Sequence, residues 1–155
     1  MLPFKKILCP TDFSEASYQA LSAADEIARH FSAEVLLVHV VEPLVTAPPG
    51  PATFNVAEYQ IQLVGSAKSG LEAVAKERFS KGVKVEQTVL EGGPAYQIVH
   101  LAEREQVDLI VIATHGQTGW RHLLFGSVAE KVVRLASCAV LTVQVPHGDE
   151  QEKKS

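Results

Sequence analysis

The 155-residue chain has the length of a single domain, and 46% of its residues are hydrophobic, enough for a buried core. Its 14 lysines and arginines are outnumbered by 18 aspartates and glutamates, and the basic residues are scattered rather than gathered in a stripe. Nucleic-acid binders need a basic surface that displaces counterions from phosphates, so we exclude that class of partner.

Residues 1–10 carry an apolar run after two lysines that is too short for a signal peptide or a membrane span. We therefore expect a cytoplasmic protein with no membrane partner. Cys9 and Cys138 each lie in an apolar run without CxxC spacing. Both are expected to be small buried hydrophobes rather than disulfide or zinc ligands.

The first half of the chain predicts two strands and two helices. Residues 4–10 form a short apolar run, and apolar residues then recur with helical spacing up to residue 31. Residues 35–41 are a β-branched run, typical of a strand covered on both faces. Residues 42–54 contain four prolines and predict a loop, and a helical pattern returns over 55–80.

The second half continues the alternation. Residues 83–90 predict a strand near an edge of the sheet, and Gly92-Gly93-Pro94 opens a helix to about residue 106, with proline suited to the first helical position. A very apolar strand over 107–114, a glycine-containing loop, a helix over 128–136 and a strand over 138–145 follow. The polar residues 147–155 are expected to be a disordered tail.

Five strands alternating with four helices predict one α/β domain over residues 1–146. The expected architecture is an open, doubly wound, Rossmann-like parallel sheet with helices on both faces. In such sheets ligands bind beyond the C-terminal ends of the strands, where the winding direction reverses. The residues that follow the first and fourth predicted strands are therefore the candidates for a site.

The stretch after the fourth strand is suited to an anion. Gly116 permits close approach of a ligand, and Gly126-Ser127 leads directly into a helix, whose N-terminal N–H groups and partial positive charge can hold phosphate without a lysine. An alternative is that Ser127 and Glu130 form a capping box that satisfies the helix's own N–H groups. Neither a P-loop nor the G-x-G-x-x-G motif of dinucleotide binders is present.

Three polar side chains near these strand ends are candidates for contact with a ligand or for a structural role. Asp12 either accepts from ribose hydroxyls, or helps to hold a cation beside phosphates, or caps the following helix. His39, inside a predicted strand, is expected to be a hydrogen-bonded core histidine. His115, in the loop, is the better candidate for contacting a ligand, although a lone loop histidine is commonly only exposed.

Several segments together resemble the universal stress protein family over nearly the whole chain. The resemblance is carried by Lys-Ile-Leu-Cys-Pro-Thr-Asp-Phe-Ser at residues 6–14, Leu-Val-His-Val at 37–40, Asp-Leu-Ile-Val-Ile at 108–112, Thr-His-Gly at 114–116, and Leu-Leu-Phe-Gly-Ser-Val-Ala-Glu-Lys-Val at 123–132. ATP-binding members have glycine, two residues, glycine, nine residues, then glycine with serine or threonine. Gly116 and Gly126-Ser127 fit the second and third parts, but Ala113 replaces the first glycine.

The resemblance implies a sheet of strand order 3-2-1-4-5 and a cytoplasmic, homodimeric stress-response protein that binds ATP, AMP or ADP, with Mg or Mn as a possible phosphate-bound cation near Asp12. It implies that the two copies pair through their last strands, Val140 to Val145. The alternatives are a slow ATPase and a dimeric interaction protein that no longer binds nucleotide. The implied contacts to nucleotide come from Pro10, Thr11 and Asp12 near the adenosine, the Val40 backbone at the adenine edge, Gly116, Gly126, Ser127 and Val128 around the phosphates, and Ala113 and His115 beside them.

Overall fold

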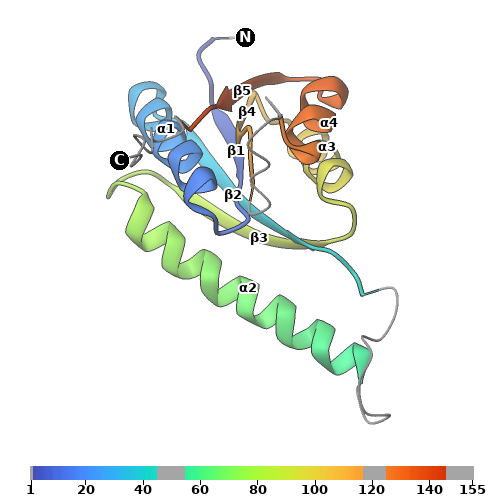
Figure 1. The fold of residues 1–155 in the computed structure, drawn as a ribbon. Coiled ribbons are helices and arrows are strands. Elements are labelled where there is room, and N and C mark those ends of the chain that lie inside the picture. Colours follow the sequence, from blue (N-terminus) through green and yellow to red (C-terminus); the bar gives the residue numbers. More distant parts are fainter. Residues whose placement is uncertain (1, 45–54, 117–124, 146–155) are drawn as a thin grey trace, which may run out of the picture.

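Strands and helices alternate without exception along the described part of the chain (Figure 1). The computed structural model describes residues 2–44, 55–116 and 125–145. The elements are β1 (Lys6–Pro10), α1 (Glu15–Phe31), β2 (Glu34–Val41), α2 (Val56–Arg78), β3 (Val85–Glu91), α3 (Pro94–Arg104), β4 (Leu109–Ala113), α4 (Ser127–Leu135) and β5 (Ala139–Val143). Every predicted element is confirmed, and the ends differ from the predicted ones by a few residues, as is usual for fraying termini. The predicted tail lies outside the described residues.

The strands form one parallel sheet in the order β3-β2-β1-β4-β5. This confirms the doubly wound architecture and the order that the family resemblance implied. Helices α1 and α2 lie on one side of the sheet, and α3 and α4 lie on the other (Figure 1). The winding therefore reverses between β1 and β4, which are neighbours in the sheet.

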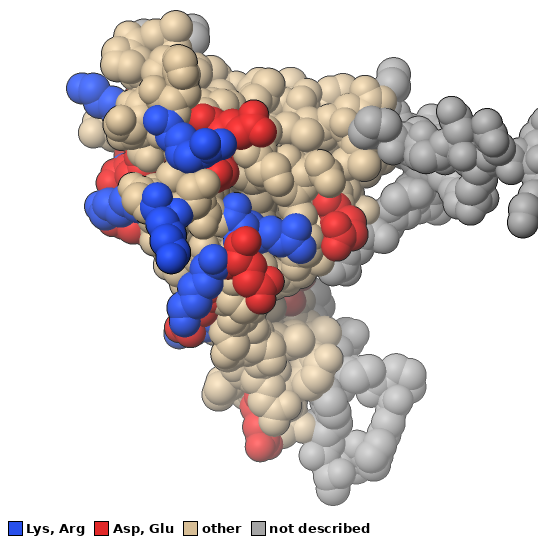
Figure 2. Space-filling model, turned by 90° about the vertical axis from the view of Figure 1, so that its left-hand side faces the viewer, with Lys and Arg blue, Asp and Glu red and all other residues tan. Residues whose placement is uncertain are grey.

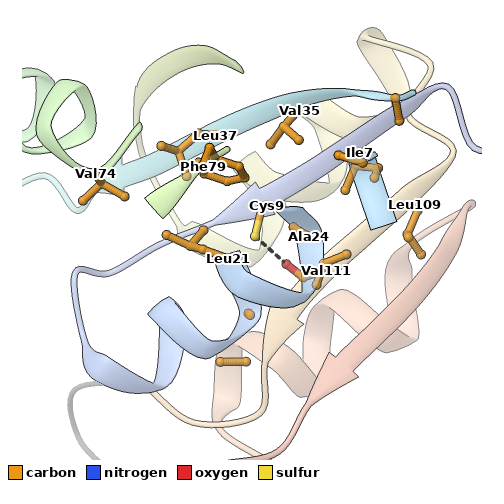
Figure 3. Close-up of a cluster of buried hydrophobic side chains, with 14 of the residues drawn as sticks. Ile7, Cys9, Leu21, Ala24, Val35, Leu37, Val74, Phe79, Leu109 and Val111 are labelled. Atoms are coloured by element: carbon orange, nitrogen blue, oxygen red, sulfur yellow. Dashed lines mark hydrogen bonds between the residues drawn. The ribbon is translucent and has the colours of Figure 1, made fainter. Parts of the chain in front are cut away.

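Both faces of the sheet are apolar because helices cover both. On the α1 and α2 face, Leu21 and Val74 pack with Cys9 and the inward side chains of β2 and β4 (Figure 3). The Cys9 thiol is fully buried and donates to the Val111 carbonyl at 3.2 Å. Burial raises the pKa of this thiol, so Cys9 is an inert core residue, as predicted.

A buried carboxylate ties α1 to the chain that follows α2. Asp25 accepts from the Ser80 backbone N–H at 2.8 Å, from the Ser80 hydroxyl at 2.7 Å, and from Arg29 Nε at 3.2 Å. Because its charge is hydrogen-bonded on both oxygens, Asp25 can be buried without a large desolvation cost. This contact fixes the C-terminal end of α2 against α1.

The two edges of the sheet differ in charge. Edge strand β3 exposes Glu86, Gln87 and Glu91, whereas edge strand β5 (Ala-Val-Leu-Thr-Val) carries no charged residue and leaves Leu141 39% exposed. Figure 2 shows a face of the molecule on which basic and acidic side chains lie intermixed.

None of the helices in the described ranges has the length and hydropathy to cross a bilayer.

Candidate functional site

A cavity of about 350 Å³ lies at the C-terminal ends of β1, β2 and β4, where the winding reverses. Its size is within the range of small-molecule sites. All the residues that the sequence singled out for a site line this one cavity. They are Pro10, Thr11, Asp12, Val40, Ala113, His115, Gly116, Gly126, Ser127 and Val128.

The turn between β1 and α1 is fixed by hydrogen bonds at every residue. Thr11 is buried, donates its N–H to the Val38 carbonyl at 2.8 Å, and shares a hydrogen bond with the Ser17 hydroxyl at 2.8 Å. Asp12 Oδ1 accepts from the N–H and the hydroxyl of Ser14. The helix cap itself is Ser14, whose Oγ accepts from the Ser17 N–H. The capping interpretation of Asp12 was therefore wrong, because Asp12 stands two residues before the cap and bonds to the capping residue.

The second wall of the cavity is the start of α4. Gly126 is the N-cap residue, and no side chain caps the helix within the described residues. Its N–H donates to the Thr114 carbonyl at 2.6 Å, which ties the helix start to the end of β4. The alternative of a capping box formed by Ser127 and Glu130 is wrong, because the N-cap residue is Gly126, which has no side chain, and Ser127 is already the first helical residue.

An uncapped helix start gives this wall its electrostatic character. The first-turn N–H groups of α4 carry the partial positive charge of the helix dipole, and Ser127 and Val128 line the cavity. An anion placed there would accept from the N–H groups that no described side chain caps. Glu130, also in the first turn, is exposed. Its N–H is the first in α4 that bonds within the helix, to the Gly126 carbonyl, so it is not one of the free donors.

Ala113, which replaces the first glycine of the ATP-binding pattern, has an ordinary strand conformation. This residue ends β4, pairs with Val143, and is not among the described residues with positive φ. By strand alternation its methyl lies on the same face as Leu109 and Val111, in the cluster beneath α1. An alanine at this position therefore fits the backbone without strain.

His39 is both a hydrogen-bonded histidine, as predicted, and a lining residue of the cavity. Its Nδ1 donates to the Thr11 carbonyl at 2.8 Å, and its ring lies 4.6 Å from that of Phe13. His39 lies near the C-terminal end of β2, and its side chain is half-buried. His115 bonds to the Thr114 hydroxyl at 2.9 Å.

Some lining residues were not predicted as site residues. Thr114 is buried at the end of β4, and its place in the Thr-His-Gly segment was the signal that could have identified it. The others belong to no local motif, and only the packing of their helices, strands and loops brings them to the site. They are Ser17, Glu42, Pro94, Ile98, Ile112 and Ala129.

The described residues contain no group of three or more histidine, cysteine, aspartate or glutamate side chains arranged to hold a metal ion. Asp12 and Glu42 are the carboxylates among the described lining residues, and two carboxylates would hold a divalent cation only together with other ligands. Phosphate oxygens are ligands that Mg²⁺ commonly shares with one or two carboxylates. A divalent cation at this site would share these carboxylates with the phosphates of a bound ligand.

A doubly wound parallel sheet with a cavity at its reversal point defines the class of α/β domains that take small ligands beyond the strand ends. Within this class, the model of the universal stress protein family matches residues 3–144. The chain belongs to the universal stress protein family.

Relatives of similar length support this membership. Universal stress protein MJ0531 of Methanocaldococcus jannaschii is 41% identical over 145 residues, which cover 92% of this chain and 84% of the relative. The solved structure of MJ0577, a universal stress protein of the same organism, is 34% identical with a TM-score of 0.78 and covers 94% of this chain and 99% of that chain. The universal stress protein of Archaeoglobus fulgidus in complex with dAMP is 25% identical, with a TM-score of 0.59, and covers 92% of this chain and 98% of that one.

Proposed function

We propose that the cavity binds an adenine nucleotide, with ATP as the expected ligand. The observation that carries this proposal is the uncapped start of α4, which opens into the same cavity as Asp12 and Val40. A helix start favours the negative charge of phosphate, and an exposed strand end offers backbone groups to a base. The family member solved with dAMP supports an adenine nucleotide as the class of ligand.

Within this proposal each lining residue has a role that its chemistry suits. The Val40 backbone would meet the adenine edge, and Pro10 and Thr11 would lie near the adenosine. Asp12 would accept from ribose hydroxyls or share a Mg²⁺ or Mn²⁺ ion with the phosphates. Gly116 and the first turn of α4 would surround the phosphates, with Ala113 and His115 beside them. The described lining residues include no lysine or arginine, and in this proposal the backbone N–H groups at the start of α4 donate to the phosphates.

Titration calorimetry of the purified chain with ATP and AMP tests this proposal, together with mass analysis of any nucleotide released by acid. We expect micromolar affinity, because several charge-assisted hydrogen bonds of about 1.5–3 kcal/mol each can offset the cost of ordering the ligand. No co-purified nucleotide and no heat of binding would overturn it.

A pair of substitutions that each introduce one negative charge sharpens the test. Ser127→Glu places a carboxylate in the first turn of α4, where it suits the helix dipole but repels phosphate. Ala57→Glu introduces the same carboxylate in the first turn of α2, away from the cavity. We expect Ser127→Glu to weaken ATP binding by about 100-fold or more and Ala57→Glu to leave it unchanged.

We further propose a homodimer that forms through β5, because this uncharged edge exposes Leu141 together with Val133 and Leu135 of α4. A stress-response role follows the name of the family, and a cytoplasmic location remains a prediction from the sequence. ATP hydrolysis is the alternative function, with Asp12 and His115 as the candidate groups near the phosphates. Turnover that survives a second purification and is lost in Asp12→Ala would favour that alternative.

A further inference from the structure

The residue after Asp12 has an unusual backbone conformation. Phe13 has φ of 63°, in the left-handed region that bulky side chains rarely adopt. It connects Asp12 to Ser14, the N-cap of α1. A phenylalanine keeps such a conformation only where its surroundings hold it in place.

Two residues from other elements hold the Phe13 ring. The His39 ring of β2 lies 4.6 Å away, tilted by 38°. Gly70 of α2 also lies against the ring, because a Cβ atom there would stand 3.0 Å from both Cε1 and Cζ. The ring therefore occupies the space that a side chain at residue 70 would need.

The same contacts hold the backbone on both sides of Asp12. His39 Nδ1 donates to the Thr11 carbonyl, and the Thr11 hydroxyl accepts from the Phe13 N–H at 3.0 Å. Asp12 is thereby held against Gly116, where a Cβ would lie 2.5 Å from Asp12 Oδ2. Phe13 and Gly70 are not among the described residues that line the cavity, so they can act on a ligand only through Asp12 and its neighbours.

We propose that Gly70 and Phe13 are positioning residues for the nucleotide site. Gly70 has no side chain and so leaves space for the Phe13 ring. The packed ring holds residue 13 in the left-handed conformation, and this conformation fixes the position of the Asp12 carboxylate. The inference rests on the proposed function, and it adds that nucleotide affinity depends on how α2 packs against the turn after β1. Helices α1 and α2 lie on the same side of the sheet, which brings Gly70 to this turn (Figure 1).

A matched glycine on the same helix provides the control. Gly65 of α2 has nothing within 4 Å of the position of its Cβ, so substitutions there change helix propensity without displacing a neighbour. We compare Gly70→Ala and Gly70→Leu with Gly65→Ala and Gly65→Leu by calorimetry with ATP. We expect Gly70→Leu to weaken ATP binding at least about tenfold, Gly70→Ala to weaken it less, and the Gly65 variants to stay within about twofold of the unsubstituted chain.

A double-substitution cycle tests whether the effect passes through the ring. Phe13→Ala alone should weaken ATP binding, and adding Gly70→Leu to it should cost no more than about twofold. The backbone amide chemical shifts of Asp12 and Gly116 give a second measurement that needs no nucleotide. These NMR shifts should change in Gly70→Leu and remain unchanged in Gly65→Leu. Circular dichroism of each variant reports whether it is folded, and Gly70→Ala with Phe13→Ala carries the test if Gly70→Leu does not fold.

The outcomes separate the two proposals. An unsubstituted chain that binds neither ATP nor AMP overturns the proposed function. If the unsubstituted chain binds and Gly70→Leu binds as well as Gly65→Leu, the positioning role is overturned. An equal loss from Gly70→Leu with and without the Phe13 ring overturns it too, because Gly70 would then act by a route that does not involve the ring.

Discussion

The carboxylate of Asp12 packs against the backbone of Gly116, so that a Cβ at residue 116 would stand 2.5 Å from Asp12 Oδ2. The two residues follow β1 and β4, the neighbouring strands between which the winding reverses. Residue 116 is thus glycine because a side chain would not fit beside Asp12, and not because its backbone has a positive φ. Any side chain there must displace the carboxylate or move the loop.

Gly116→Ala should therefore weaken ATP binding by about tenfold, because the added methyl displaces the Asp12 carboxylate from its place in the cavity wall. The free energy of unfolding should change by less than about 1 kcal/mol, since the displaced group borders a cavity rather than the core. Calorimetry and urea unfolding measure the two effects, with Gly65→Ala as the control. Unchanged affinity would mean that the position of Asp12 does not matter for the ligand.

Ala113→Gly should destabilise the fold and leave nucleotide affinity nearly unchanged. The methyl is 8% exposed and belongs to the core cluster beneath α1, and glycine in a strand adds an entropic cost, so we expect a loss of about 1–2 kcal/mol. Urea unfolding measures the loss and calorimetry measures the affinity. A sharp rise in ATP affinity would instead favour the alternative that this chain has lost its ligand through the alanine.

Leu141→Glu should convert the proposed dimer into a monomer, because it places a charge at the centre of the uncharged edge strand β5. We expect the dissociation constant of the dimer to rise by at least about 100-fold, as measured by sedimentation velocity over a range of concentrations. Ile61→Glu on α2, where the side chain is 72% exposed, makes the same apolar-to-acidic change elsewhere. If both variants sediment like the unsubstituted chain, β5 is not the interface.

Asp108 should stabilise the fold in a pH-dependent way. Its Oδ2 accepts from the backbone N–H groups of Lys5 at 2.7 Å and Lys6 at 2.9 Å, and these hydrogen bonds hold the pKa of the carboxyl below its ordinary value of 3.8. A lowered pKa in the folded state means that the contribution is complete above about pH 4 and is lost as the pH falls through the folded-state value.

Asp108→Asn should accordingly lower the free energy of unfolding by about 1 kcal/mol at pH 7. The difference from the unsubstituted chain should shrink below pH 4 and vanish at lower pH. Urea unfolding across this range measures it, and Glu72→Gln on the exposed face of α2 serves as the control. A difference that is independent of pH would show that the ionised carboxylate is not the stabilising group.

The alternation of strands and helices could be read from the sequence because each element carries its own period of apolar residues. The run at Val35–Val41 and the pattern around Leu21 and Ala24 are local signals, and the structure confirms both elements. The order of strands is not a local property. It followed from the family resemblance, since doubly wound sheets of different order share the same alternation.

The candidate site could be located from the sequence, but its details depend on contacts between distant segments. Gly126 and Ser127 are both good N-cap residues, and the hydrogen bond from the Gly126 N–H to the Thr114 carbonyl decides between them. The left-handed conformation of Phe13 has no signal in the residues beside it. It depends on Gly70, far along the chain, whose missing side chain makes room for the ring.

The contrast between the two edges of the sheet has a consequence for how many copies can join. Edge-to-edge pairing through β5 would turn the β3 strand of each copy outward, with Glu86 and Glu91 facing the solvent. Acidic side chains on an outer strand repel another strand of like charge, so such a dimer has no sheet edge left that would pair with a further copy. Growth by strand addition would then stop at two chains, and this sheet would not extend into a ribbon.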